Sequence, residues 1–311
     1  MAEAFDGKAF DVRQVRRAFS RSAPGYARAA ALQREIESRL LESLDYLDDP
    51  ALGRAPPQVV VDVGSGPAHA ALAMRKRWPR ARVLALDIAL PMLREAGSRL
   101  PWWQRAGGRG LDRVCADARA LPLREGSVDV LFSNLCLQWV DDLPAAFAGF
   151  RRVLRPGGLL LVSTFGPETL FELREAFARA DDAPHVSPFA SIARFGDALV
   201  QAGFRDPVLD RDLFVHAHPD MAHLMRELRA MGATNALAAR RHALTGRARF
   251  AAAAAAYDTL RRADGGLPAT WEAIYAHAWA PQPGAPIREG GVETVGVPLS
   301  SIPIRRRPPR P

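Results

Sequence analysis

The sequence predicts an α/β protein built on a largely parallel sheet, because strand-like runs alternate with helical segments through its first half. Five such runs fall near residues 58–63, 82–87, 112–116, 128–133 and 158–164. Strands that are joined through helices pair in parallel with right-handed crossovers. Ligands of such sheets bind beyond the carboxyl ends of the strands, so the strand ends are the first places to look for a site.

The first strand runs into a glycine pair in the sequence VVVDVGSGP, residues 59–67. Gly64 and Gly66 permit positive φ and let a ligand approach the backbone closely. The start of the helix that follows offers free N–H groups, which suit a carboxylate or phosphate. A dinucleotide fingerprint would have its third glycine where His69 stands. The stretch therefore predicts a nucleotide-like ligand of another kind.

Acidic residues end the next two strands as well. Asp87 follows the glycines by about twenty residues, where doubly wound folds place a ribose-binding carboxylate. Ile88 and Met92 come next and offer apolar surfaces on which an adenine can lie. Asp117 and Ala118 close the third strand. A single acidic residue at the end of a strand is usually only exposed to solvent. Acidic residues at the ends of three successive strand–helix units instead favour a site that binds a nucleoside.

The pattern Asp62-x-Gly64-x-Gly66 resembles motif I of the class I S-adenosylmethionine (SAM) methyltransferases, although Ser65 and Ala68 replace a frequent Cys and Gly. In that family the glycine loop faces the methionine part of SAM, and the next two acids face the ribose and the adenine. The resemblance implies a Rossmann-like, seven-stranded, mostly parallel sheet. It implies SAM as cofactor, held by Asp62, Gly64, Gly66, Asp87, Ile88, Met92, Asp117, Ala118 and Asn134.

The rest of the chain surrounds this core. An amphipathic helix over 11–26, with a turn at Pro24-Gly25, and a second helix over 29–47 precede the first strand, where such enzymes often carry a lid. Alternation predicts a sixth strand at 207–216 and an antiparallel seventh at 270–280. The expected divisions are a helical lid (1–50), the SAM-binding core (51–219), a helical substrate-side insertion (220–263), the final strand (264–280) and a Pro/Arg-rich tail, partly disordered (281–311).

Four stretches resemble one family, the malonyl-acyl-carrier-protein O-methyltransferases of biotin synthesis. They are VRRAFSRSAPGY (15–26), SNLCLQWVDDL (133–143), PHVSPF (184–189) and LMRELRAMGATNALAARRHALTGR (224–247). The last is the most specific because it lies outside the shared methyltransferase core. The family implies methyl transfer from SAM to the free carboxyl of a malonyl thioester carried by the acidic acyl carrier protein.

The resemblance also implies residue roles on the substrate side. Tyr26 resembles the lid tyrosine that folds over SAM, and His185 and Arg240 are candidates to bind the malonyl carboxylate through charge-assisted hydrogen bonds. Asn134 and Gln138 stand where the substrate side is lined. Structural alternatives are a core-packing Tyr26, a loop-capping His185, strand-end capping by the two amides, and Arg240 on a solvated helix face. A face for the carrier protein is expected from Arg151, Arg152, Arg226, Arg229 and Arg241.

Composition narrows the function classes. The formal net charge is +8, but its cations are almost all Arg, with Lys8 and Lys76 as the two lysines. This indicates coding bias rather than nucleic-acid binding. No run approaches the roughly twenty apolar residues of a membrane span. Cys115 and Cys136 lack a CxxC spacing, so neither a metal site nor a disulfide framework is predicted. We expect a cytoplasmic enzyme that binds neither membrane nor nucleic acid.

Two other interpretations remain open from the sequence. The SAM-binding respiratory complex I assembly hydroxylase, which acts on a protein arginine, resembles the chain over the same insertion and residues 251–279. The PHV loop at 184–186 and the TGR turn at 245–247 favour the biotin enzyme. The other interpretation is a small-molecule carboxyl methyltransferase, which would turn over a free acid or thioester without the carrier.

Overall fold

A computed structural model describes residues 9–48, 55–98, 111–241, 245–282, 284, 287–289 and 292–294. Within them one sheet of seven strands has the order β3-β2-β1-β4-β5-β7-β6. The strands are β1 (Val59–Val63), β2 (Arg82–Asp87), β3 (Asp112–Cys115), β4 (Val128–Ser133), β5 (Leu154–Phe165), β6 (Arg205–His218) and β7 (Leu267–Trp279). The predicted fold class is confirmed.

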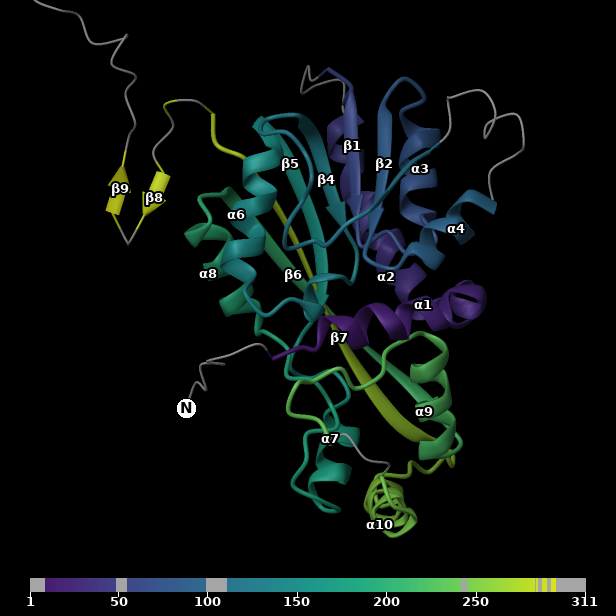
Figure 1. Cartoon of the computed structure of the whole chain (residues 1–311). Coiled ribbons are helices and arrows are strands. Elements are labelled where there is room, and N and C mark those ends of the chain that lie inside the picture. Colours follow the sequence, from purple (N-terminus) through teal and green to yellow (C-terminus); the bar gives the residue numbers. More distant parts are fainter. Residues whose placement is uncertain are drawn as a thin grey trace, which may run out of the picture.

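The strands pair as the connections require. β3, β2, β1, β4 and β5 are parallel neighbours, whereas β7 runs antiparallel to both β5 and β6. The carboxyl ends of the five parallel strands therefore open at one edge of the sheet, below the sheet in Figure 1. The strand expected near 158–164 begins earlier, because Arg155, Pro156 and Gly157 are part of β5, which has an irregular register against β4.

Helices cover both faces of the sheet (Figure 1). They are α1 (Val12–Ala29), α2 (Ala31–Glu42), α3 (His69–Arg77), α4 (Leu90–Ser98), α6 (Leu143–Val153), α7 (Phe171–Ala178), α8 (Ile192–Gln201), α9 (Met221–Ala230) and α10 (Arg247–Asp258), with 3₁₀ turns η1 (Ser43–Asp48) and η3 (Leu137–Trp139). None of the described helices is both long and apolar enough to cross a bilayer.

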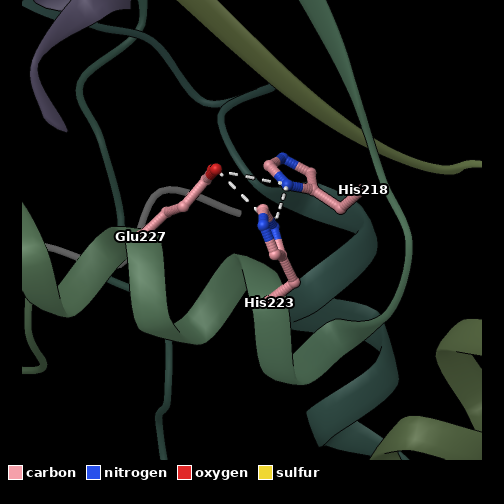
Figure 2. Close-up of side chains that lie close together, drawn as sticks. All are labelled: His218, His223 and Glu227. Atoms are coloured by element: carbon pink, nitrogen blue, oxygen red, sulfur yellow. Dashed lines mark hydrogen bonds and ion pairs between the residues drawn. The ribbon is translucent and has the colours of Figure 1, made fainter.

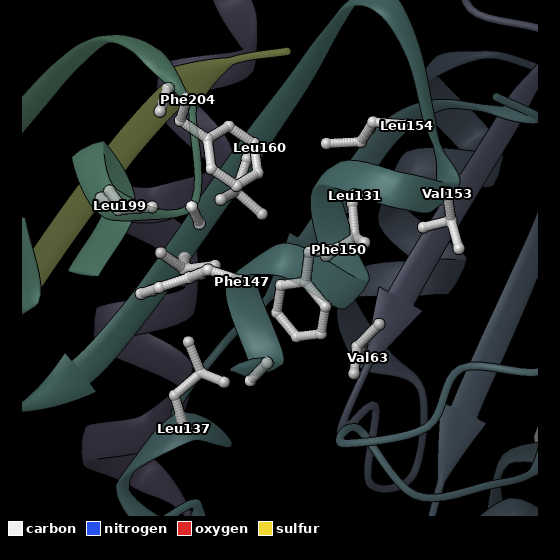
Figure 3. Packing of buried hydrophobic residues seen from close by; sticks show 14 of the residues in the cluster. Val63, Leu131, Leu137, Phe147, Phe150, Val153, Leu154, Leu160, Leu199 and Phe204 are labelled. Atoms are coloured by element: carbon white, nitrogen blue, oxygen red, sulfur yellow. The ribbon is translucent and has the colours of Figure 1, made fainter. Parts of the chain in front are cut away.

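Alternate residues of the central strands face different helix layers. Val61 and Val63 of β1 pack with Phe147 and Phe150 of α6, while Val60 faces the layer of α2 and α3. Figure 3 shows the α6 aromatic rings against Val63, Leu131 and Leu160. The Phe147 ring meets Phe150 edge-on at 6.1 Å between centroids. Close packing on both faces holds the strand ends in fixed positions.

The N-terminal helices differ from the prediction in two places. The turn expected at Pro24-Gly25 is wrong, because α1 continues through Pro24 to Ala29. Proline removes one helical hydrogen bond, but the buried Ala23 packs against Ala89 and Met92, which holds this turn of the helix. The single helix expected over 29–47 is divided at Ala30 and ends in the 3₁₀ turn η1.

A second layer of helices lies beyond the carboxyl end of the sheet. Figure 1 shows α7, α9 and α10 around the lower part of β7, with α1 crossing above them. Buried apolar residues of α2, α7, α9 and α10 pack there around Trp271 of β7. In the predicted tail, β8 (Ile287–Glu289) and β9 (Val292–Thr294) pair as a short antiparallel ladder, and residues 295–311 lie outside the described residues.

Candidate functional site

The loop between β1 and α3 depends on its glycines. Gly64 and Gly66 have φ of +72° and +51°, which L side chains rarely adopt. A Cβ built on Gly64 would lie 2.5 Å from Cβ of Cys136. The Gly64 and Ser65 amides both donate to the Leu86 carbonyl at the end of β2. The loop is thus pressed against neighbouring strand ends, and only glycine fits at position 64.

Asp62 fixes the helix that follows this loop. Its carboxylate is 2% exposed and accepts a hydrogen bond from the Ala71 amide at 3.1 Å. Burial raises the pKa of Asp62 well above its ordinary value. The contact ties β1 to the first turn of α3 across the glycine loop.

Asp87 connects the end of β2 to the glycine loop. One carboxylate oxygen accepts the Gly66 amide at 2.8 Å and the other accepts the Ala89 amide at 2.7 Å. These two donors lower the pKa, but burial outweighs them and raises the pKa of Asp87 to about 6. Each carboxylate oxygen has two lone pairs, so acceptor capacity remains for a ligand hydroxyl.

Asp117 is held by a residue that the sequence analysis did not single out. The Arg119 guanidinium donates to both Asp117 oxygens, at 2.9 and 2.5 Å. This hydrogen-bonded ion pair keeps the pKa of Asp117 below its ordinary value. The acid is therefore ionised and positioned before any ligand arrives.

The loop, the two acids and α1 enclose what we call the cofactor cavity. It is lined by every predicted cofactor residue except Asp62, together with Val12, Val15, Phe19, Tyr26, Ala116, Arg119, Leu135, Cys136, Trp139 and Val140. Asp62 lines an adjoining hollow with Arg34, Glu37 and Ser65. The predicted cofactor residues are thus brought together.

The cofactor cavity fits SAM chemically. Fixed carboxylates face it beside the apolar side chains of Ile88 and Met92, which suits a nucleoside. The adjoining hollow offers a cation and an anion, Arg34 and Glu37, which suits an amino-acid end. Ser65 Oγ is buried there with no hydrogen-bond partner among the described residues. A buried hydroxyl without a partner is costly, so it is available to a polar ligand group.

Tyr26 lies directly over the glycine loop. Its ring carbon Cε1 is 3.8 Å from the position of a Cβ on Gly66, and the ring packs with Ala23, Ala89 and Met92. Burial raises the pKa of the Tyr26 phenol. The ring packs on the core, as the core-packing alternative states, and its place over the glycine loop leaves the lid role as a prediction.

A larger cavity of about 320 Å³, which we call the substrate cavity, adjoins the cofactor cavity. The two share the side chains of Phe19, Tyr26, Leu135 and Trp139. Trp139 was not predicted as a site residue. Its indole Nε1 is buried without a hydrogen-bond partner among the described residues. The signal available in the sequence was its place in the SNLCLQW stretch.

His185 lines the substrate cavity, and Asp181 and Phe177 hold its ring in place. Its Nε2 lies 3.0 Å from Oδ1 of Asp181, and its ring stacks on Phe177 with 4.0 Å between centroids. The other Asp181 oxygen is 3.8 Å from both Arg241 and Arg249. The imidazole is therefore fixed in orientation at the cavity wall.

Arg240 also lines the substrate cavity, but not from a solvated helix face. It follows α9 in the chain, and its side chain is only 16% exposed. The guanidinium donates to the Leu237 carbonyl at 2.9 Å and to Oδ2 of Asp11 at 3.0 Å. Asp11 is also the N-cap of α1. Arg240 thus joins α1 to the segment after α9, and the solvated alternative is wrong.

The two predicted amides have different surroundings. Asn134 donates to the Gln33 carbonyl at 3.1 Å and accepts from Ser163 Oγ at 2.6 Å, so it connects α2 to the sheet at the cofactor cavity. Gln138 has a buried Oε1 without a partner among the described residues and lines the substrate cavity. Gln33, which sequence reasoning missed, is in the same situation.

The five predicted docking arginines do not form one face. Arg152 on α6 donates to the Leu121 and Leu123 carbonyls, and Figure 1 shows α6 far from α9, which carries Arg226 and Arg229. Periodicity alone did not reveal this separation. Arg229 and Arg241 line the substrate cavity, together with Arg240.

Comparison with known proteins agrees with this geometry. Residues 61–162 match the family model described as a methyltransferase domain. A putative methyltransferase from Bacillus halodurans has the same fold, with a TM-score of 0.53 at 17% identity over 79% of this chain and all of that one. The YcgJ protein from Bacillus subtilis gives a TM-score of 0.51 at 17% identity over 72% of this chain and 92% of that one.

Full-length relatives are much more similar. The malonyl-[acyl-carrier protein] O-methyltransferase of Xylella fastidiosa (strain M23) is 59% identical over 96% of this chain and 98% of its own length. The protein of the same name from Gallionella capsiferriformans (strain ES-2) is 44% identical over 88% of this chain and 92% of its own length. By sequence, fold and site geometry, the chain belongs to the malonyl-[acyl-carrier protein] O-methyltransferase family.

Proposed function

We propose that this protein transfers the methyl group of SAM to the free carboxylate of malonyl-acyl carrier protein and releases the methyl ester. The observation that supports this most directly is the junction of the two cavities at Tyr26 and Trp139, with His185 and Arg240 on the wall of the larger one. The names of full-length relatives support the same substrate. In biotin synthesis such an ester masks the malonyl charge.

The cofactor side would be held mainly by the strand ends. The Gly64–Gly66 backbone, Asp87 and Asp117 would bind SAM, with Ile88 and Met92 against its adenine. When bound, SAM supplies a methyl group made electrophilic by its sulfonium. The buried Asp87 is most useful to the ribose in its ionised form, which is a hydrogen-bond acceptor only.

The substrate side needs no general base. A carboxylate is already ionised at neutral pH, so the chain has no proton to remove. Its task is to hold a carboxylate oxygen in line with the methyl group and to exclude water. Arg240 has five N–H donors and uses two on Asp11 and Leu237, which leaves donors for the malonyl carboxylate. Phe19 and Trp139 provide apolar walls at the junction.

The carrier protein would approach the cationic side of the substrate cavity. Arg229 and Arg241 line the cavity, and their side chains are more exposed to solvent than that of Arg240. Charge complementarity speeds the encounter with an acidic partner, and salt screens it. We propose the cytoplasm as the compartment, because the two cysteines, Cys115 and Cys136, are free thiols.

The test is mass spectrometry of malonyl-acyl carrier protein after incubation with the purified protein and SAM. The expected product carries one added methyl on the malonyl group. Arg240→Ala should lower kcat/KM for the carrier substrate by about 30-fold, equivalent to ~2 kcal/mol for a lost charged hydrogen bond. SAM affinity measured by calorimetry should change less than twofold. Arg194→Ala, an exposed arginine of α8 outside the substrate cavity, is the matched control.

Parallel substrates separate the alternatives. Equal turnover of malonyl-coenzyme A or free malonate would favour a small-molecule carboxyl methyltransferase. SAM binding without methylation of any of these acids would contradict the proposal and favour an assembly-factor role. An unchanged rate for Arg240→Ala would remove that residue from the carboxylate site while leaving the reaction itself in place.

A further inference from the structure

Three side chains with metal-binding atoms meet on the outer side of α9. His218 ends β6, and His223 and Glu227 lie one helical turn apart on α9. Figure 2 shows the three side chains pointing toward one another. Nδ1 of His218 is 3.4 Å from Nδ1 of His223 and 3.4 Å from Oε2 of Glu227, and His223 Nδ1 is 3.6 Å from Oε1 of Glu227.

The 3.4 Å between the two imidazole nitrogens matches the separation of ligands around a tetrahedral ion, and each imidazole nitrogen also lies near one oxygen of the Glu227 carboxylate. With metal–ligand bonds of about 2.0–2.1 Å and tetrahedral angles, ligand atoms lie about 3.3–3.4 Å apart. Within the described part of the chain, His218, His223 and Glu227 form the one group of three potential metal ligands whose ligand atoms all lie within 4.8 Å of one another. Two imidazole Nδ1 atoms in contact can form at most one hydrogen bond with each other. A metal ion between them would instead accept a lone pair from each nitrogen.

The fold holds the ligands in place. His218 is 5% exposed, and its backbone pairs with Leu267 at the start of β7. Asp220 caps α9 by accepting the His223 amide at 2.7 Å, which fixes the first turn of the helix. His223 and Glu227 are four residues apart and so share one face of α9. The site requires little ordering before an ion can bind.

The ligand types select the class of ion. Two imidazoles and one carboxylate suit a borderline transition metal such as Zn²⁺. Mg²⁺ and Ca²⁺ prefer oxygen ligands and a higher coordination number than this cluster offers. Glu227 and His223 are partly exposed, so water can reach the fourth position. The spacing His218-x4-His223-x3-Glu227 falls within the range seen in zinc motifs. It was not singled out from the sequence, because metal ligands were sought among the cysteines.

We propose that His218, His223 and Glu227 bind one divalent transition-metal ion, best Zn²⁺, with water as fourth ligand. The ion fastens the start of α9 to the end of β6. Met225, Leu228 and Arg229 of the same helix line the substrate cavity, so the ion supports the cavity wall from behind. This site is separate from methyl transfer and stands whether or not the proposed substrate is correct.

The first experiment measures binding to the full chain without an affinity tag, after removal of metal by a chelator. Equilibrium dialysis against Zn²⁺ should give one tight site per chain. Co²⁺ as a probe should give the intense visible absorption of a tetrahedral complex. Loss of a direct ligand in His223→Ala or Glu227→Ala should weaken Zn²⁺ binding by about 100-fold. His216→Ala is the matched control, since His216 is an exposed histidine of β6 outside the cluster.

The second experiment tests the structural consequence. At a Zn²⁺ concentration above the dissociation constant of the wild type and below those of the ligand variants, Zn²⁺ should raise the Tm of the wild type and of His216→Ala. It should leave the Tm of His223→Ala and Glu227→Ala nearly unchanged, because an ion stabilises only a state that binds it. Both ligand variants change partly exposed side chains, so they are expected to fold without metal. Equal Zn²⁺ affinity in the wild type and both ligand variants, or no stoichiometric binding at all, would overturn the proposal. Binding without a Tm shift would overturn the fastening role.

Discussion

The two cavities are built in different ways, although they share a wall. The cofactor cavity rests on the backbone of one loop, on Asp87 at the end of β2 and on Asp117 just after β3. The substrate cavity is assembled from side chains of α1, α2, α7, α9, β7 and the loops around His185 and Arg240. The first is fixed by the sheet, while the second depends on how distant segments pack.

The sharpest way to break the cofactor side is Gly64→Ala. The variant must adopt φ near +72° and place a Cβ 2.5 Å from Cβ of Cys136. We expect SAM affinity to fall by about 100-fold or more, from overpacking added to backbone strain. Calorimetry measures the change. The matched control is Gly126→Ala, where φ is +59° but no atom lies within 4 Å, so strain acts alone.

A rescue variant makes that prediction specific. Cys136→Gly combined with Gly64→Ala removes the clashing Cβ and should recover a large part of the lost affinity. Equal loss of SAM binding in the single and double variants would show that the contact with Cys136 is not what makes glycine necessary at position 64.

Asp87→Ala should have the next largest effect, also confined to the cofactor side. Loss of the buried acceptor leaves the Gly66 and Ala89 amides and the ligand hydroxyls unpaired. We expect SAM to bind ~1–3 kcal/mol more weakly. At saturating SAM, the KM for malonyl-acyl carrier protein should hold within twofold. A large rise in that KM would mean that the two cavities are not separable.

pH provides a smaller test of the same group. Burial raises the pKa of Asp87 to about 6, and its ionised form is the better ribose acceptor. SAM affinity should therefore fall about tenfold between pH 7 and pH 5. In the cofactor-free protein the free energy of unfolding changes with pH in the opposite direction to the SAM affinity. The protonated carboxyl contributes stability that is full below its ordinary pKa and is lost as pH rises through about 6. Asp87→Asn should flatten both profiles between pH 5 and pH 7.

The smallest predicted effect lies on the substrate side and concerns Asp11. Asp11→Ser keeps an N-cap for α1 but removes the partner of Arg240. The KM for malonyl-acyl carrier protein should rise by about two- to fivefold, as expected for a partly exposed ion pair. SAM affinity should not change. Asp11→Ala adds the loss of the cap and should lower the Tm further, which unfolding by heat will show.

This comparison also explains what the sequence could reveal. The strands, the glycine loop and Asp62, Asp87 and Asp117 were predictable because each signal lies within a few residues of the next. His185 and Arg240 were singled out only through the family resemblance, and their substrate roles stay predictions. Trp139 and Gln33 were missed because their importance comes from buried polar atoms that face a cavity formed by distant segments. The uninterrupted course of α1 through Pro24 is likewise a result of tertiary packing.

The position of β7 sets an order for synthesis on the ribosome. In the described sheet β6 pairs with β7 alone, and β7 lies between β5 and β6. The strands of the cofactor half are complete once β5 has emerged, and they pair among neighbours. Residues 205–218 have no partner strand until Leu267–Trp279 leave the exit tunnel. Long-range pairing of this kind closes late. The five parallel strands beside the cofactor cavity can therefore pair in the nascent chain before Trp271 of β7 is available to complete the wall of the substrate cavity.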